Sequence, residues 1–266
     1  MSLLTTRPAP DSELLHDVED GIVRVTFNRP QARNALTFAM YEGLAALCEA
    51  VDEDRDIRAM IITGAGEKAF AAGTDITQFR SFKTPEDGIA YETRIERILD
   101  RIERCRVPTI AAIAGACTGG GAAIAAVCDM RIASADTRVG FPIARTLGNC
   151  LSIANLARLS GLIGAARTKE MIFTARLLDA AEAKEAGFLN EVLPDQAAMR
   201  THVDELARLL ASHAPLTLSA TKEALRRLQT SGPDDHDLVV SCYMSADFRE
   251  GMEAFLAKRQ PHWTGR

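Results

Sequence analysis

One uncharged stretch of the chain limits what it can fold into. From Val107 to Cys128, 22 residues carry no charged side chain, and three consecutive glycines at 119–121 lie among them. A run of this length could span a bilayer as a helix. Pro108 and the glycines argue against a helix, because each interior glycine costs about 1 kcal/mol relative to alanine. We instead expect a buried strand at 108–114, a glycine turn, and a helix from about residue 120 to 127.

We consider three explanations for the glycines at this turn. Close packing of the helix on its neighbours is the first, because glycine has no Cβ. A nucleotide cradle is the second, but "GACTGGG" (115–121) matches neither G-x-G-x-x-G nor a P-loop. The third is an anion site made of unpaired N–H groups at a helix start. Gly73 and Thr74 follow an earlier predicted strand in a similar way, and two N–H donors suit an enolate or a tetrahedral oxyanion.

Apolar runs and helical periodicity alternate along the chain. After a polar leader, strands are predicted at 21–28, 58–63, 108–115, 129–134 and 137–141, and helices at 37–54, 89–105, 120–127, 151–160, 164–173 and 179–187. The last helix starts with a capping box, Asp179 with Glu182, and stops at Gly187. From about residue 195 the pattern is nearly all helical. The predicted fold class is therefore α/β, with a βα core and a helical C-terminal lobe.

Composition and charge favour a small-molecule ligand. The chain has 266 residues, 47% hydrophobic and 25% charged, and a net charge of −5. These values are ordinary for a globular protein. No basic run with interleaved aromatic residues is present, which argues against nucleic acid or an anionic membrane as a partner.

The cysteines and histidines exclude several kinds of site. The N-terminus lacks the features of a signal peptide, and no C-x-x-C occurs, so we expect a reduced, cytoplasmic protein in which each cysteine is a small buried hydrophobe. No histidine lies between residues 17 and 201, which disfavours a Ser-His-Asp or Cys-His site in the central region, and no spacing suggests zinc. The six cysteines are Cys48, Cys105, Cys117, Cys128, Cys150 and Cys242.

Five segments together resemble the crotonase family, the enoyl-CoA hydratase/isomerase superfamily. They occur in the order and approximate spacing of that family and extend over nearly the whole chain. The segments are "FNRPQARNALT" (27–37), "AFAAGTDITQF" (69–79), "VPTIAAIAGACTGGGAAIAAVCDMRIAS" (107–134), "FP" (141–142) and "FREGMEAFLAKR" (248–259).

The resemblance implies a fold, an assembly and a substrate class. The implied fold is a crotonase-like spiral of ββα turns over residues 1–200, with a helical lobe over 201–266 that forms homotrimers or dimers of trimers. The implied substrate is an acyl-CoA thioester, with coenzyme A as part of the substrate. No metal, flavin or nicotinamide cofactor is expected.

The resemblance also implies site residues. The thioester oxygen would be held by the N–H groups of Thr74 and Gly120. Arg33 or Arg29 could pair with the CoA phosphates, although either arginine could instead be simply solvated, and Asp75 could be a cap of its own loop. The substrate-binding residues implied in this way are Gln31, Arg33, Ala35, Ala72, Asp75, Ile76, Gly119, Pro142 and Ile143.

The sequence departs from the family at the two catalytic glutamates. Ala123 and Ile143 occupy their places, and a one-residue shift in alignment would put Ala144 in the second. Without a positioned acid or base, a contribution of about 10²–10⁴-fold is lost, so efficient hydration is not expected. Decarboxylation, thioester hydrolysis, C–C cleavage and non-catalytic acyl-CoA binding stay open. Substitute groups could be Tyr91, Glu92, Glu96, Arg145, Asn149 or Cys150, and Asp129 and Arg131 are expected to be structural.

Overall fold

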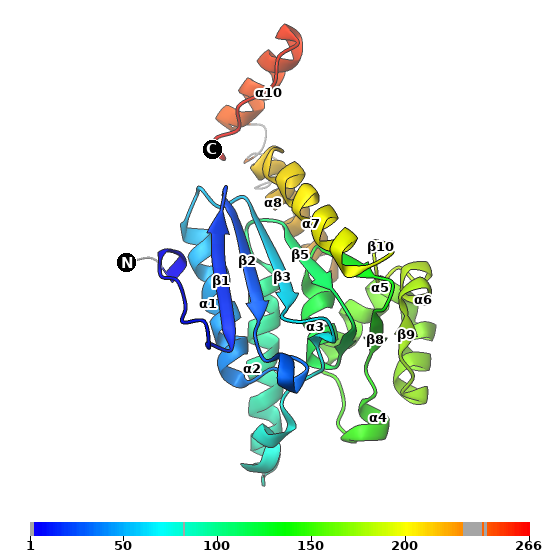
Figure 1. Cartoon of the computed structure of the whole chain (residues 1–266). Helices are drawn as coiled ribbons and strands as arrows, with labels where there is room; N and C mark the ends of the chain where they lie inside the picture. Colours follow the sequence, from blue (N-terminus) through cyan, green and yellow to red (C-terminus); the bar gives the residue numbers. More distant parts are fainter. Residues whose placement is uncertain (1–2, 82, 231–240, 242–243) are drawn as a thin grey trace.

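Two β-sheets form the centre of the molecule (Figure 1). The computed structural model describes residues 3–81, 83–230, 241 and 244–266. The larger sheet has the strand order β1 (Leu14–Glu19), β2 (Ile22–Phe27), β3 (Ala59–Gly64), β5 (Thr109–Ile113), β7 (Met130–Ser134) and β10 (Glu191–Leu193). The smaller has the order β4 (Ala69–Ala71), β6 (Ala116–Thr118), β8 (Arg138–Gly140) and β9 (Leu178–Asp179).

The chain passes from the larger sheet to the smaller one in each of three successive turns. Strands β3, β5 and β7 are parallel neighbours in the larger sheet, and β4, β6 and β8, which follow them directly, are parallel neighbours in the smaller sheet. Only β1 with β2 and β8 with β9 pair antiparallel among the described strands. This repeated step is the spiral that the family resemblance implied, and the predicted α/β class is confirmed.

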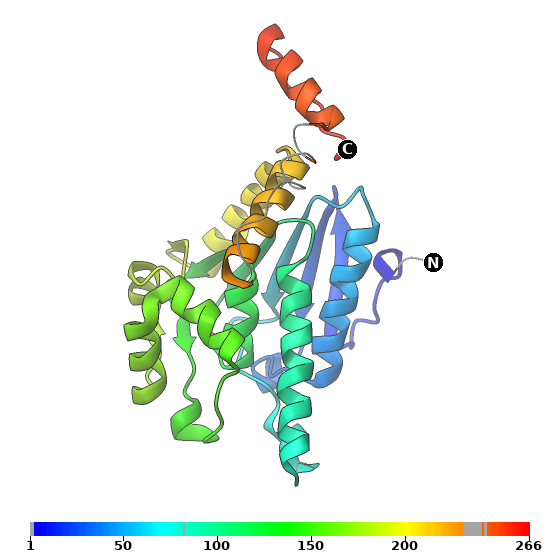
Figure 2. The same ribbon diagram turned by 180° about the vertical axis from the view of Figure 1, so that it is seen from behind.

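Helices cover both faces of the larger sheet. Figure 2 shows α1 (Phe38–Glu53) and α2 (Pro85–Glu103) across one face, and Figure 1 shows α7 (Gln196–Ala211) along the other. Residues of β3 alternate between the two, since Met60 and Ile62 join the core under α1 and α2, while Ala59 and Ile61 pack with α7. This alternation follows from the two-residue repeat of a strand that is buried on both faces.

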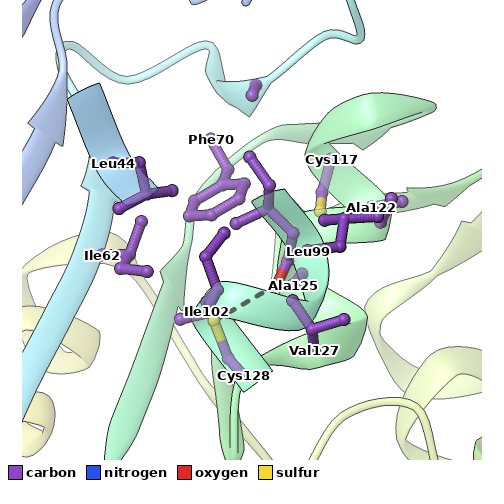
Figure 3. Packing of buried hydrophobic residues seen from close by; sticks show 14 of the residues in the cluster. Leu44, Ile62, Phe70, Leu99, Ile102, Cys117, Ala122, Ala125, Val127 and Cys128 are labelled. Atoms are coloured by element: carbon purple, nitrogen blue, oxygen red, sulfur yellow. Dashed lines mark hydrogen bonds between the residues drawn. The ribbon is translucent and has the colours of Figure 1, made fainter. Parts of the chain in front are cut away.

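The helix after the glycines, α3 (Gly120–Val127), is buried in the main core. Its Ala122, Ala125 and Val127 lie close to Phe70 and Leu99 (Figure 3). The bounds match the predicted 120–127. The predicted turn is shorter than expected, however, because residues 116–118 form β6, which pairs with β4 and β8. Residues 116–118 show too short an apolar alternation to be told from a turn by sequence.

Several other boundaries differ from the sequence-based expectation. The supposed polar leader contains β1, which has one buried side chain, His16. The two helices expected at 151–160 and 164–173 are present as the two halves of α5 (Ile153–Thr174), which is broken at Gly164, where φ is 76°; only their bounds are shifted. The remaining short elements are η1 (Leu3–Thr5), η2 (Pro30–Ala32), η3 (Ile76–Ser81), α4 (Ile143–Thr146) and α6 (Ala180–Glu185).

The C-terminal part of the described chain is helical, as predicted. It contains α7, α8 (Pro215–Thr230) and α10 (Ala246–Ala257), and α10 stands away from the sheets in both views (Figures 1 and 2). Helix α7 runs through residue 200 and packs on the larger sheet. The division into a core at 1–200 and a lobe at 201–266 stays a prediction.

The cysteines largely follow the expectation of buried thiols. Cys48, Cys105, Cys117 and Cys128 are buried, but the prediction is wrong for Cys150, which is exposed in the loop after α4. Cys242 lies outside the described residues. Within the described ranges, no helix has the length and apolar character needed to cross a membrane, and no group of three or more His, Cys, Asp or Glu side chains could hold a metal ion.

Candidate active site

A cavity of about 380 Å³ lies where the loop after β4 meets the start of α3. Three stretches of chain line it: 72–76 after β4, 118–120 at the start of α3, and 141–151 from β8 to the start of α5. Side chains from α1 and α2 also line it. The cavity therefore lies at the junction of the first two spiral turns.

Two glycine-containing loops approach each other closely in this cavity. Gly73 has φ 104° and Gly119 has φ 52°, which are left-handed values that favour glycine. A Cβ added to Gly119 would lie 3.5 Å from the Cα of Gly73, and one added to Gly120 would overlap the Tyr41 hydroxyl and lie 3.0 Å from Thr74 Oγ1. The positive φ therefore favours glycine at 119, and the lack of room beside Tyr41 favours glycine at 120.

In the part of the chain that the structure describes, the backbone N–H groups of Thr74 and Gly120 have no acceptor. Leu36 N–H donates to Gly73 O over 2.8 Å, and Asp75 N–H donates to Leu36 O over 2.9 Å. This parallel bridge uses the groups on either side of Thr74 and not its own N–H. Gly120 begins α3, where an N–H has no partner inside the helix. No hydrogen bond in the described chain is donated by either N–H group.

Three hydroxyl groups form a chain beside these donors. Thr74 Oγ1 lies 2.9 Å from Tyr41 Oη and 3.2 Å from Tyr91 Oη. Burial is the main cause that raises the pKa of both tyrosines above the usual value. Both phenols therefore stay protonated near neutral pH, so they can donate hydrogen bonds but cannot act as bases.

One acidic side chain lines the cavity. Glu92 on α2 is half-buried there, and burial, followed by the charge of Glu96, raises the pKa of Glu92. Glu96 itself binds Arg158, with 2.7 Å between Glu96 Oε1 and Arg158 Nη2. Ala123 and Ile143, at the places where the resemblance implies glutamates, also line the cavity, and their side chains carry no polar atom.

The predicted substrate-binding residues divide into two groups. The cavity is lined by Ala72, Thr74, Ile76, Gly119, Gly120, Pro142 and Ile143, but not by Gln31, Arg33, Ala35 or Asp75. The segment that holds Gln31, Arg33 and Ala35 nevertheless runs beside the cavity loop, since Ala72 N–H donates to Arg33 O over 3.0 Å. Of the suggested substitutes for the glutamates, Tyr91, Glu92, Asn149 and Cys150 line the cavity, and Glu96 and Arg145 do not.

The charged residues of the two loops have different roles. Arg29 Nη1 donates to Ala35 O over 2.6 Å and to Asp75 Oδ2 over 3.0 Å, so Arg29 ties the loops together. Asp75 also accepts from Thr77 Oγ1 over 2.7 Å, which makes it a cap of its own turn. Arg33 is exposed, and no ion pair to it occurs in the described part of the chain. Of the two arginines, only Arg33 is available for a phosphate.

Asp129 and Arg131 are structural, as expected. Asp129 Oδ2 accepts from Thr109 N–H over 2.7 Å and from Lys222 Nζ over 2.5 Å. Arg131 is buried, and its Nε donates to Phe188 O over 2.6 Å. Neither residue lines the cavity.

Sequence reasoning missed Tyr41. This residue sits in the first turns of α1, fully buried, and reaches Thr74 across 33 positions of sequence. A tyrosine on the apolar face of a predicted helix gives no sign of such a contact. The one hint in the sequence is that Tyr41 follows the segment 27–37, which resembles the family and is implied to lie near the site.

A second cavity of about 770 Å³ adjoins the first. It extends along the start of α2, opposite the loop that follows α4, and these two segments lie at the same end of the molecule in both views (Figures 1 and 2). Its wall is largely apolar. Six residues line both cavities: Phe79, Tyr91, Glu92, Leu147, Asn149 and Cys150.

The spiral of strands, with a cavity at the meeting of its loops, defines a protein of the crotonase class. Residues 17–266 match the model of the enoyl-CoA hydratase/isomerase family. The chain belongs to this family. The resemblance seen in the five sequence segments is thereby confirmed.

Individual relatives extend over almost the entire chain. A short-chain-enoyl-CoA hydratase of Clostridium acetobutylicum is 33% identical over 254 residues, which make up 94% of this chain and 96% of that protein. Among solved structures, an enoyl-CoA hydratase/carnitine racemase from Magnetospirillum magneticum has a TM-score of 0.89 and 35% identity, covering 96% of both chains. An enoyl-CoA hydratase from Bacillus anthracis has a TM-score of 0.86 and 31% identity, covering 96% of this chain and 100% of that one.

Proposed function

We propose that this protein is an enzyme that acts on acyl-CoA thioesters and stabilises a CoA enolate or a related oxyanion. The thioester oxygen would accept hydrogen bonds from the N–H groups of Thr74 and Gly120. One observation carries the proposal: two N–H groups without acceptors, from separate loops, line one cavity. Two converging donors are what a developing oxyanion requires, and loss of one such donor typically costs about 3 kcal/mol.

The rest of the site supports an apolar acyl group. The CoA part would lie along the exposed segment with Gln31 and Arg33, and the pantetheine would enter past Ala72 and Ile76. The acyl chain would point toward the second cavity, whose wall includes Phe79, Ile89 and Leu147. Burial of such a chain is favourable by about 0.8 kcal/mol per methylene.

We infer that hydration of a 2-enoyl-CoA is not the efficient reaction of this site. Hydration needs one group to activate water and one to deliver a proton, and the two family positions hold Ala123 and Ile143. The relatives that match are named as hydratases, so this inference separates the chain from them. Decarboxylation, thioester hydrolysis and C–C cleavage all use an oxyanion donor pair and are the alternatives, together with non-catalytic acyl-CoA binding.

A mass-spectrometric turnover screen tests this proposal. The purified protein is incubated with crotonyl-CoA and with medium-chain, aromatic and malonyl-type acyl-CoAs. We expect slow or no gain of water on crotonyl-CoA and faster conversion of another thioester. Fast hydration of crotonyl-CoA would overturn the argument from Ala123 and Ile143. Tight binding without conversion of any thioester would favour the non-catalytic alternative.

A further inference from the structure

We propose that Glu92 is the catalytic acid–base residue of this site and exchanges a proton with the acyl Cα of the bound thioester. The proposal rests on the proposed function, because the enolate that forms needs the donors Thr74 and Gly120. It goes beyond that function by assigning the proton transfer to α2, an element on which neither of the two glutamate positions of the family lies.

The position of Glu92 gives it access to both parts of the substrate. It lines the smaller cavity together with Thr74 and Gly120, and it lines the larger apolar cavity as well. Among the described residues that line either cavity, Glu92 is the only one with a carboxyl, guanidinium or ammonium group. The reacting carbon of an acyl chain running from one cavity to the other would pass this carboxyl group.

Glu92 also differs from the other half-buried acids on its helix. Each of those is held by a donor: Asp87 Oδ2 accepts from Thr84 N–H over 2.9 Å, Asp100 binds Arg104 over 2.7 Å, and Glu96 and Glu103 bind Arg158 over 2.7 and 2.9 Å. Within the described chain, no hydrogen bond or ion pair to Glu92 is found. Burial of an unpaired carboxyl group costs folding free energy. A structural role would not explain why the chain keeps such a group, whereas a catalytic role would.

The surroundings of Glu92 raise the pKa of its carboxyl group. Burial raises its pKa most, and the charge of Glu96 raises it further. Tyr91 on the same helix and Tyr41 on α1 stay neutral, and the Cys150 thiol lies on the loop after α4. Arg158 on α5 is paired with Glu96 and Glu103 of the same helix as Glu92. A raised pKa makes a carboxylate a stronger base and brings its acid form closer to neutral pH.

The proposed step balances without an added reagent. Glu92 takes a proton from the acyl Cα, and the electron pair of that C–H bond forms the Cα=C1 bond of the enolate. The π pair of the thioester carbonyl moves to its oxygen, and the N–H groups of Thr74 and Gly120 donate hydrogen bonds to that oxygen and stabilise its negative charge. The reverse step returns a proton from Glu92 to Cα and restores the thioester.

Deuterium exchange tests the step directly. Hexanoyl-CoA and phenylacetyl-CoA are incubated with the protein in D₂O, and incorporation at Cα is followed by mass spectrometry. The wild type is expected to exchange the Cα position of at least one of the two. Glu92→Gln is expected to slow exchange by about 10²-fold or more, while the Kd for hexanoyl-CoA changes less than about threefold. Glu86→Gln, on the exposed part of the same helix, is the matched control and should exchange at the wild-type rate.

The pH dependence of the exchange rate distinguishes a catalytic role of Glu92 from a structural one, because a purely structural residue would not set the pH at which exchange begins. Exchange requires the Glu92 carboxylate, so its rate should rise with pH through the raised pKa of Glu92. Glu96→Gln removes the charge that helps raise this pKa, so the acid limb of the profile should move to lower pH. This variant leaves residue 92 intact, so it tests the assignment even if Glu92→Gln does not fold.

Three results would overturn the assignment. These are exchange in folded Glu92→Gln at the wild-type rate, an unmoved acid limb in Glu96→Gln, or no exchange of either probe by the wild type. If the wild type converts a thioester in the turnover screen but exchanges neither probe, Glu92 is not the acid–base group and the proposed function stands. If it does neither, both proposals fail.

Discussion

At the scale of single residues, the three glycines of the opening stretch do different work. Gly119 and Gly120 line the cavity, Gly119 with a φ of 52° and Gly120 where a Cβ would overlap the Tyr41 hydroxyl. Gly121 points into the core, where a Cβ would overlap the Ala71 carbonyl oxygen. The packing explanation therefore holds for Gly121, and the donor role is proposed for Gly120 alone, because the N–H of Gly119 donates to Gly140 O over 3.0 Å.

Arg33 and Arg29 allow a residue-scale prediction about CoA binding. Arg33→Gln should weaken binding of hexanoyl-CoA about tenfold, because one charge-assisted contact with a phosphate is lost. It should leave binding of the hexanoyl thioester of pantetheine unchanged, since that ligand has no phosphate. Isothermal titration measures both values.

Arg29→Gln is the control for this prediction. It removes the ion pairs with Glu13 and Asp75 that join the loops, so it should lower Tm. Equal weakening of both thioesters by Arg33→Gln would contradict a phosphate contact at Arg33.

At the scale of elements, helix starts position the site. Helix α2 begins with a capping box in which Thr84 Oγ1 accepts from Asp87 N–H over 3.3 Å and the Asp87 carboxylate accepts from Thr84 N–H. This box fixes the turn of α2 that leads to Tyr91 and Glu92. Helix α3 begins at Gly120 with no side-chain cap, which leaves its first N–H group for a ligand.

A pair of glycine substitutions tests how tightly these two helices are packed. Gly121→Ala in α3 should destabilise the protein by about 1–3 kcal/mol, because the added Cβ has no room. Gly88→Ala in α2 should stabilise it by about 0.5–1 kcal/mol, because nothing lies within 4 Å of the added Cβ and alanine favours a helix. Denaturant unfolding measures both, and a stabilising Gly121→Ala would contradict the packing described for α3.

The elements that could be predicted from sequence are those with a long apolar signal. Strands β2, β3 and β5 and helices α1 and α3 lie within about two residues of their predicted bounds. Strand β1 was missed because three of its six residues are polar and only one side chain is buried, while its neighbour β2 supplies most of the buried side chains of the pair. Strands β4 and β6 were missed because their three residues show no alternation that sets them apart from the loops beside them, whereas the equally short β8 lies within the predicted 137–141.

The site could be predicted only in part. Thr74 and Gly120 come together as the family segments implied, because those segments hold the loop ends of adjacent turns. Tyr41 carries no local signal, and the choice of Glu92 over Glu96 depends on Arg158, which lies 62 positions from Glu96. Long-range pairing of this kind is not encoded in spacing along the chain.

At the scale of the whole molecule, apolar side chains on the outer helices support assembly. Phe173 of α5 is 77% exposed, and Leu225 and Leu228 of α8 are 58% and 67% exposed. Leu225 and Leu228 lie three positions apart on α8 and so share one face of that helix, and exposed apolar surface is typical of a protein interface. We predict a homotrimer or a dimer of trimers, as the family resemblance implies.

Light scattering after gel filtration tests the assembly. The wild type should have three or six times the mass of one 28.8 kDa chain. The double substitution Leu225→Asp with Leu228→Asp should give a smaller species with unchanged far-UV circular dichroism. A wild-type mass of a single chain would contradict the prediction.

Infrared spectroscopy of a bound thioester examines the two backbone donors most directly. Hexanoyl-CoA labelled with ¹³C at the thioester carbonyl is bound to two variants in a Tyr41→Phe background, Gly120→Ala and Gly120→Pro. Both variants carry a Cβ where Tyr41→Phe has removed the overlapping hydroxyl, and only proline lacks the N–H. We predict that the carbonyl stretch falls to lower frequency in the Gly120→Ala complex and falls clearly less in the Gly120→Pro complex. Equal frequencies in the two complexes would contradict the role assigned to Gly120.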